Sequence, residues 1–300
     1  MYPKPFTIFI MRNLELKNSK RLLIYSIISI QLVIFNCPLT IGQELGYPII
    51  CNYNPKEIAN GTQVRCAIQD NRGIMYFGAS DVIEYDGVTW RTISSDKLTL
   101  AYDLAKDKNG KIYVGAIDEF GYLELEKKGT TIYKSLVHLI KGKFFKIGIV
   151  RSVNMTSHYI YFQSQFAIFQ YHPIDNNLII LKPEKADIFT GGFVFGDTFY
   201  TISKTKGLQK IVNNQLVDCL QSKSFKQYDF RRATLFNDSS VLIQSPTKGL
   251  FLFQPDKSRK LQEFQLKDNS FITDNRIDRF YKSNNNRIRP TNPIFPIRYS

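Results

Sequence analysis

The feature that most constrains the fold of this chain is a nine-residue pattern that occurs twice, 37 residues apart. The copies share one aspartate, two glycines and one tyrosine, and they read Asp70-x-x-Gly73-x-x-Tyr76-x-Gly78 and Asp107-x-x-Gly110-x-x-Tyr113-x-Gly115. The aspartate can accept backbone N–H groups of a tight turn, and the first glycine supplies the positive φ that such a turn needs. The second glycine ends an apolar run, where a missing Cβ permits close approach of a neighbouring backbone. The pattern therefore predicts a repeated β-hairpin.

The first copy extends into a unit of four short strands. Apolar and β-branched residues predict strands at 64–68, 74–77, 81–85 and 88–93. Asp86-Gly87 separates the third strand from the fourth, and it is the strongest short hairpin signal in the chain. Trp90, the only tryptophan, falls in the fourth strand, where we expect it to pack against a neighbouring unit.

Four further units follow the first. The five units span 63–93, 101–136, 148–182, 189–220 and 230–265, and each contains four strand-like runs. One four-residue sequence occurs twice, 42 residues apart, as Thr205-Lys206-Gly207-Leu208 and Thr247-Lys248-Gly249-Leu250. This match supports a repeat length of about 40 residues independently. A four-stranded unit repeated about every 40 residues is typical of a β-propeller. The predicted fold is therefore all-β, a β-propeller of four-stranded antiparallel blades.

A sixth unit begins at 275 but does not follow the pattern to its end. Residues 275–281 predict a first strand and 283–286 a turn, so the partial unit spans 275–286. Residues 287–300 contain three prolines and no glycine, and proline removes hydrogen bonds from a sheet. We expect an irregular tail there, from a truncation or a change of reading frame. The propeller would then be open or partial, with exposed edges unless partner chains or downstream blades complete it.

The first 43 residues have the pattern of an export signal. Basic residues precede the apolar run 22–35, which is shorter than the roughly 20 residues that a membrane span needs. Small residues then precede a candidate cleavage point before Gln43. A cleaved signal peptide and an uncleaved N-terminal anchor both stay open. Either one predicts that residues 44–281 face the periplasm or the outside of the cell.

Two segments resemble a known repeat family. The first reads Ile68-Gln69-Asp70-x-x-Gly73-x-x-Tyr76-Phe77-Gly78 and continues as Val82-Ile83-Glu84-Tyr85-Asp86-Gly87-Val88-x-Trp90. This segment, and 107–125 after it, is similar to the two-component regulator propeller repeats. Those repeats occur in the exported sensor regions of bacterial hybrid histidine kinases and related transmembrane regulators, notably in Bacteroidota. The resemblance covers residues 45–281.

The resemblance implies a periplasmic seven-bladed propeller, followed by a β-sandwich, a membrane helix and an intracellular output domain. This chain departs from that pattern, because it has about five and a half predicted blades. It also has no second hydrophobic span, kinase segment or helix-turn-helix. The sequence therefore fits the sensor part of such a regulator.

The net charge bears on which ligands the protein could bind, and the cysteine spacing bears on whether its thiols are paired. The net charge is +14, but the basic residues form no dense stripe, so we expect no nucleic-acid partner. A weak preference for acidic ligands is consistent with the charge. The four cysteines, Cys37, Cys51, Cys66 and Cys219, have no C-x-x-C spacing. We expect buried thiols, with a Cys51–Cys66 disulfide as the alternative.

The sequence contains no recognisable catalytic or metal-binding constellation. His138, His158 and His172 have no metal-ligand spacing, and nucleophile and phosphate motifs are absent. The turn and blade signature consists of Asp70, Gly73, Gly78, Asp86, Gly87, Trp90, Asp107, Gly110, Gly115, Gly207 and Gly249. We expect no catalytic residue, metal or cofactor, and the pattern leaves the ligand-binding residues unknown.

Two functions follow as hypotheses. The first is a non-catalytic, extracytoplasmic sensing or interaction propeller for an unknown small ligand, with an oligosaccharide as the expected class. The second is an exported propeller enzyme, a hydrolase or lyase acting on glycans. The second needs two carboxylates, or a tyrosine with a base, that converge on the axis. Asp118, Glu119 and Asp197 fall in loops and are the acidic candidates.

Overall fold

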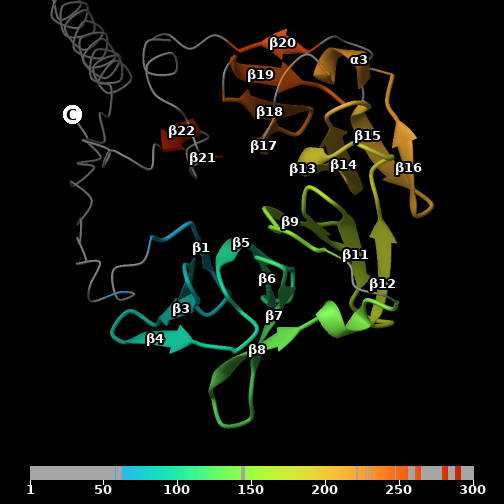
Figure 1. Ribbon diagram of the computed structural model, residues 1–300. Coiled ribbons are helices and arrows are strands. Elements are labelled where there is room, and N and C mark those ends of the chain that lie inside the picture. The colour runs from blue at the N-terminus through green and yellow to red at the C-terminus, as the bar shows by residue number, and fades with distance from the viewer. Residues whose placement is uncertain are drawn as a thin grey trace, which may run out of the picture. The chain divides into compact units, whose positions relative to one another are not determined.

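The computed structural model describes residues 58, 63–142, 146–220, 222–226, 228, 230, 232–246, 248–255 and 261–264, and the backbone of 279–282 and 288–291. These residues include five four-stranded antiparallel sheets whose strands are adjacent in sequence order (Figure 1). The fold is all-β, as the repeats predict. The predicted export signal at 1–43 lies outside the described residues. Within the described part of the chain, no helix is long and apolar enough to cross a membrane.

The sheets are numbered in chain order. Sheet 1 contains β1 (Cys66–Gln69), β2 (Met75–Gly78), β3 (Val82–Tyr85) and β4 (Trp90–Ile93). Sheet 2 contains β5 (Ala101–Lys106), β6 (Ile112–Ala116), β7 (Phe120–Leu125) and β8 (Thr131–Ser135). Sheet 3 contains β9 (Ser152–Met155), β10 (Ile160–Gln163), β11 (Ile168–His172) and β12 (Asn177–Leu181). Sheet 4 contains β13 (Phe189–Phe195), β14 (Thr198–Ser203), β15 (Gly207–Val212) and β16 (Gln215–Asp218). Sheet 5 contains β17 (Arg232–Asn237), β18 (Ser240–Ser245), β19 (Gly249–Phe253) and β20 (Gln262–Glu263).

The aspartates of the repeated pattern decide where the second strands of sheets 1 and 2 begin. Asp70 Oδ1 accepts the N–H groups of Arg72 at 2.8 Å and Ile74 at 3.0 Å. Asp107 Oδ1 accepts the Lys111 N–H at 2.8 Å in the same way. Because a carboxylate takes these N–H groups, β2 begins at Met75, one residue later than predicted, and β6 begins after Lys111 in the same way.

The turn between β3 and β4 is longer than the predicted hairpin. The ladder resumes at Trp90 and not at residue 88, so the loop has four residues. Asp86 Oδ1 accepts the N–H groups of Val88 at 2.9 Å and Thr89 at 2.7 Å, which withdraws both from the ladder. Trp90 then stacks on Tyr85 of its own sheet, with 4.2 Å between ring centroids. This stacking is within sheet 1, whereas the sequence predicts packing of the tryptophan against a neighbouring sheet.

The hydrophobic core lies between the sheets. Four clusters of buried apolar side chains join sheets 1 and 2, 2 and 3, 3 and 4, and 4 and 5 among the described residues. In sheets 1 to 4 the tyrosine of the second strand belongs to the cluster that its sheet shares with the next, and these are Tyr76, Tyr113, Tyr161 and Tyr200. Each sheet therefore depends on its neighbours to bury its faces, as in other repeat proteins.

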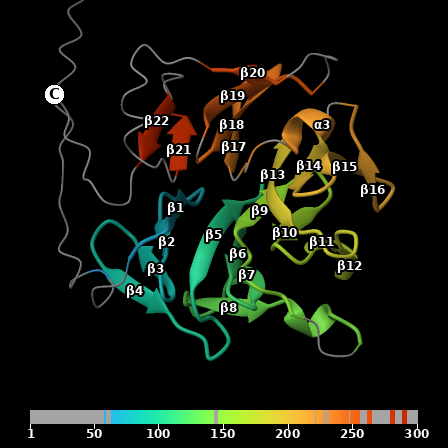
Figure 2. The same ribbon diagram turned by 45° about the horizontal axis from the view of Figure 1, so that its top comes forward.

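The first strands of consecutive sheets lie next to one another. β1 contacts β5, β5 contacts β9, β9 contacts β13, and β13 contacts β17. Figure 1 and Figure 2 both show these strands on the side where the sheets converge, with the fourth strands turned away from it. In a propeller the sheets are arranged in this way around a central channel. Side chains at the ends of first strands are thus brought together from several sheets.

A short hairpin continues the series after sheet 5. β21 (Arg279–Lys282) pairs antiparallel with β22 (Ile288–Thr291), and β21 contacts β17 as a further first strand would. The prediction of an irregular tail at 287–300 is therefore wrong for the residues of β22. Pro290 fits because β22 has a single neighbour in this sheet, and a strand at an edge leaves some backbone groups unpaired anyway.

Candidate functional site

The signature residues lie in turns and at close contacts, spread over four sheets. Five of the signature glycines have φ between +78° and +99°, namely Gly73, Gly87, Gly110, Gly207 and Gly249. Gly115 is a close contact instead, because a Cβ there would lie 2.7 Å from Val150 Cγ1 in the approach to sheet 3. A Cβ at Gly78 would lie 2.4 Å from the Cys66 sulfur. The structure does not bring these residues together into one site.

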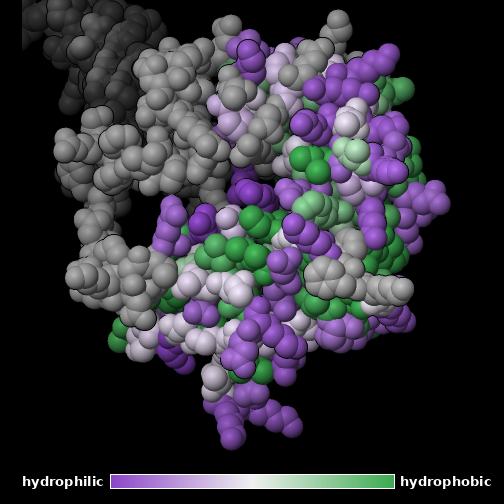
Figure 3. All heavy atoms as spheres, viewed as in Figure 1, coloured by the Kyte–Doolittle hydropathy of each residue, from purple (hydrophilic) through white to green (hydrophobic). Residues whose placement is uncertain are grey.

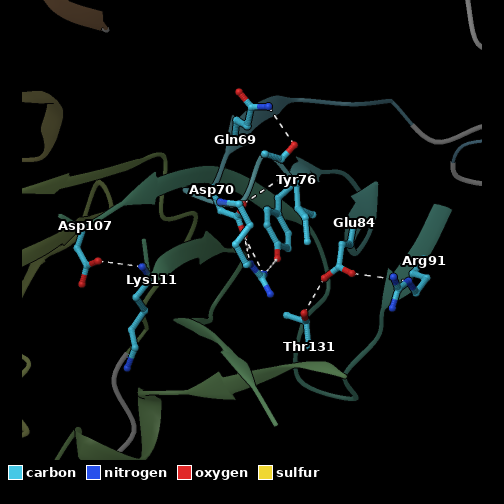
Figure 4. Close-up of polar contacts among 11 residues, drawn as sticks. Gln69, Asp70, Tyr76, Glu84, Arg91, Asp107, Lys111 and Thr131 are labelled. Carbon is cyan, nitrogen blue, oxygen red and sulfur yellow. Dashed lines mark hydrogen bonds and ion pairs between the residues drawn. The ribbon is translucent and has the colours of Figure 1, made fainter. Parts of the chain in front are cut away.

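A polar network beside sheet 1 holds its first turn (Figure 4). Arg72 donates through Nε to Asp70 Oδ2 at 2.8 Å and through a terminal nitrogen to the Tyr76 hydroxyl at 2.9 Å. Burial raises the pKa of Asp70, but the hydrogen bonds from Arg72 and Ile74 outweigh it and leave the pKa below its usual value. Burial and the charge of Glu84 raise the pKa of Tyr76 to about 12. The network therefore stabilises a turn and keeps the phenol protonated.

Two hydrogen bonds join consecutive sheets through buried polar side chains of third strands. Thr131, at the start of β8, donates to Glu84 Oε2 in β3 at 2.6 Å (Figure 4). Glu84 is only 4% exposed, and Arg91 Nε lies 3.7 Å from its other oxygen. Gln170 in β11 donates to Asn214 Oδ1, between β15 and β16, at 2.8 Å. Both contacts hold neighbouring sheets together.

A glycan-cleaving enzyme would need carboxylates in loops. The three candidate loop carboxylates instead accept hydrogen bonds from other residues of this chain. Asp118 Oδ1 accepts the Gly148 N–H at 2.6 Å. Glu119 is 5% exposed and accepts three hydrogen bonds, and burial raises its pKa. Asp197 accepts two hydrogen bonds from Ser157, at 2.6 and 2.5 Å. Asp197 lies between β13 and β14, two sheets away from the other two carboxylates.

The histidines are dispersed. His138 lies in the short helix η1 (Val137–Leu139), His158 in the turn before β10, and His172 at the end of β11. In the described ranges no three His, Cys, Asp or Glu side chains are placed to hold a metal ion. The Cys219 thiol is half-buried, and burial raises its pKa to about 11. Cys51 lies outside the described residues, so the alternative disulfide stays a prediction.

One place brings polar side chains together from equivalent positions in successive sheets. In each sheet, the residue two positions after the tyrosine of the second strand is paired with a residue of the first strand. The residue just before that partner is the one that we compare between sheets. In sheets 1 to 4 these residues are Arg65, Tyr102, Arg151 and Thr190. Arg232, the first residue of β17, stands one position further along in sheet 5. We call these five residues the first-strand cluster.

Two members of the cluster lie at β-bulges in the first strands of their sheets. In β5, Ala101 and Asp103 pair with adjacent residues of β6, so Tyr102 is the extra residue of a bulge. Thr190 is the extra residue of β13 in the same way, between Phe189 and Gly191. Bulges re-aim side chains and are frequent beside functional sites.

Contacts between different sheets show that the cluster converges. The guanidinium carbons of Arg65 and Arg151 lie 4.6 and 5.7 Å from the centroid of the Tyr102 ring. Arg232 donates to the Arg151 carbonyl oxygen at 3.5 Å, and Asp103 accepts a backbone N–H of β9 at 2.9 Å. Figure 3 shows hydrophilic side chains gathered between β5 and β17. The guanidinium groups of Arg65 and Arg151 thus meet at one phenol, and that of Arg232 reaches the backbone beside them.

Sequence reasoning missed this cluster because its members are single residues in unremarkable runs. A signal was nevertheless present. Arg65, Tyr102, Arg151 and Thr190 stand ten or eleven residues before the tyrosine of the following strand. Aligning the units on those tyrosines places the four residues in nearly one column.

Comparisons with known proteins identify the fold. No family model and no curated protein matches this chain. It is similar to the extracellular domain of a protein described as a hybrid two-component system from B. thetaiotaomicron, with a TM-score of 0.57 and 14% identity. That match covers 77% of this chain and 31% of the other. Virginiamycin B lyase from Staphylococcus aureus is also similar, with a TM-score of 0.53 and 10% identity over 71% of this chain and 73% of the lyase.

The five sheets therefore match those of propeller structures. The fold is shared with the extracellular part of a two-component sensor, in line with the repeat resemblance. It is shared with a lyase as well, and one fold commonly hosts unrelated functions. The fold alone therefore does not determine the function of this chain.

Proposed function

We propose that this propeller is a non-catalytic, extracytoplasmic module that binds a small ligand. The observation that carries the proposal is the first-strand cluster, in which equivalent positions of successive sheets converge on one place. None of its five residues belongs to the hydrophobic clusters that hold the sheets together. Polar side chains that a rigid scaffold gathers at one place, outside its core, are suited to recognising a ligand.

The same module is proposed as the input part of a two-component or transmembrane transcription regulator. Three observations support this: the repeat resemblance, the export pattern at 1–43, and the fold shared with the extracellular domain of a two-component system. An oligosaccharide is the ligand class that we propose. The chain matches 31% of that extracellular domain, so the regulatory role is part of the proposal.

A glycan hydrolase or lyase is the second candidate, because a protein with a similar fold, virginiamycin B lyase, is an enzyme. It is the weaker candidate because Asp118, Glu119 and Asp197 each serve in hydrogen bonds within the chain. Asp197 also lies two sheets away from Asp118 and Glu119.

Thermal unfolding with a panel of neutral and acidic oligosaccharides, followed by chromatography of each saccharide, tests the proposal. A ligand that binds only the folded protein raises the melting temperature by mass action. We expect at least one saccharide to raise it and to be recovered unchanged. Saccharide cleavage would establish the enzyme instead, and a panel without any stabilising member would contradict the oligosaccharide proposal.

A further inference from the structure

We propose that the first-strand cluster binds a carboxylate group, so that the ligand of this module is acidic. Arg65 and Arg151 would hold the carboxylate, and Tyr102 would position both guanidinium groups. The inference deepens the proposed function and rests on it. These arginines have different partners from the other arginines of the described sheets.

The described arginines outside the cluster are held by carboxylates. Arg72 lies 2.8 Å from Asp70, and Arg91 lies 2.9 Å from Asp86. Among the described residues, Arg65 and Arg151 have no carboxylate within ion-pair distance and instead lie against the Tyr102 ring. An arginine beside an aromatic ring is more weakly held than one in a bidentate pair with a carboxylate. Both guanidinium groups therefore retain the capacity to bind an anion.

Arg65 carries a further sign of an absent partner. Its Nε–H is buried, and no acceptor among the described residues takes its hydrogen bond. A buried donor without a partner is unfavourable, so such groups in proteins usually have a protein, solvent or ligand acceptor. The guanidinium fork matches the two oxygens of a carboxylate, and a ligand oxygen would satisfy this donor.

The charge of the surroundings favours the same ligand. The cluster contains three arginines and lies beside the Asp103 carboxylate, so these four side chains together carry a positive charge. The whole chain carries a net charge of +14, which raises the local concentration of anions and speeds their association.

Isothermal titration of the full chain with trigalacturonic acid, its methyl ester and citrate tests the inference. The ester keeps the sugar rings of the acid but removes the negative charges. We expect a carboxylate probe to bind and the ester to bind at least about tenfold more weakly. Binding of trigalacturonic acid would identify an acidic saccharide, whereas binding of citrate alone would identify a small free acid. Equal binding of acid and ester, or no binding of either carboxylate probe, would overturn the inference.

Substitutions in the cluster make the test specific to it. Arg65→Met and Arg151→Met keep an apolar stem and should each weaken carboxylate binding about tenfold or more. Arg65→Lys keeps the charge without the fork and should lose less. Lys128→Met, which removes one positive charge in the exposed β7–β8 turn, is the matched control and should bind normally. Trp90 fluorescence checks that every variant is folded. Normal binding by both Arg→Met variants would also overturn the inference.

The outcomes separate this inference from the proposed function. If neutral oligosaccharides stabilise the protein while no carboxylate probe binds, the sensing module stands and the acidic ligand is wrong. If the protein cleaves trigalacturonic acid and both Arg→Met variants lose that cleavage, the cluster does bind an acid but the non-catalytic proposal is wrong.

Discussion

At the residue scale, close packing between sheets depends on positions where a side chain does not fit. A Cβ at Gly115 would lie 2.7 Å from Val150 Cγ1, 2.9 Å from Val153 Cγ2 and 3.0 Å from the Val150 carbonyl oxygen. We therefore expect Gly115→Ala to lower the free energy of unfolding in urea by about 1–3 kcal/mol.

A glycine with a different role provides the control for that measurement. Gly129 has φ of +83°, and a Cβ added there would meet no described atom within 4 Å. Asparagine tolerates this backbone conformation, so Gly129→Asn should change stability by less than about 0.5 kcal/mol.

Adding Val150→Ala to Gly115→Ala should destabilise by less than the sum of the two single changes, because the two side chains share one contact. Simple additivity would contradict the steric explanation.

The Asp70 carboxylate predicts a pH dependence of stability. Its pKa in the folded protein is below the usual value, so its stabilising effect is complete above the unfolded pKa of about 3.9 and is lost as pH falls through the folded pKa. At neutral pH, Asp70→Asn should cost about 1–2 kcal/mol in urea unfolding. The difference from the parent protein should shrink below about pH 4. Arg72→Gln leaves the backbone hydrogen bonds to Asp70 in place and should show a smaller pH effect; a difference independent of pH would refute this account.

At the scale of the elements, β8 is attached to β3 of the preceding sheet by one buried hydrogen bond. Thr131→Val has nearly the same shape but leaves the Glu84 Oε2 oxygen without its donor. We expect it to lower the free energy of unfolding by about 1–3 kcal/mol, the cost of an unsatisfied buried acceptor. Thr131→Ser retains the hydroxyl and should lose clearly less. If valine and serine had equal effects, packing and not the hydrogen bond would join these strands.

Elements are also the level at which the sequence predicts most. Period-two patterns and turn residues locate all four strands of each of the five sheets, because these signals are local. They misplace strand ends at Ile74 and Val88, since aspartate side chains take N–H groups that a pattern assigns to the ladder. The cluster around Tyr102 escapes prediction because it depends on a bulge and on contacts between distant sheets.

At the scale of the whole molecule, the shared clusters predict that distant sheets unfold together. Phe253, in sheet 5, is 1% exposed and packs against Phe193 and Phe225. Phe253→Ala should cost about 3–5 kcal/mol. Because every pair of consecutive sheets shares buried side chains, we expect the urea midpoint of Trp90 fluorescence in sheet 1 to fall together with the circular-dichroism midpoint. An unchanged Trp90 midpoint would show that sheet 1 unfolds independently.

The hydrogen bonds between third strands and the following sheets have a consequence for how such a chain evolves. Glu84 is matched to a hydroxyl donor at Thr131, whereas Gln170 is matched to the amide oxygen of Asn214. Each junction therefore has its own chemistry, although the units share one pattern. Exchanging sheet 2 for sheet 4 would place the Glu84 carboxylate opposite the Asn214 amide, so the amide would have to present its NH2 group and not the oxygen that now accepts from Gln170. The order of the units along the chain therefore matters for these two contacts, because each side chain between sheets is matched to the group that it meets.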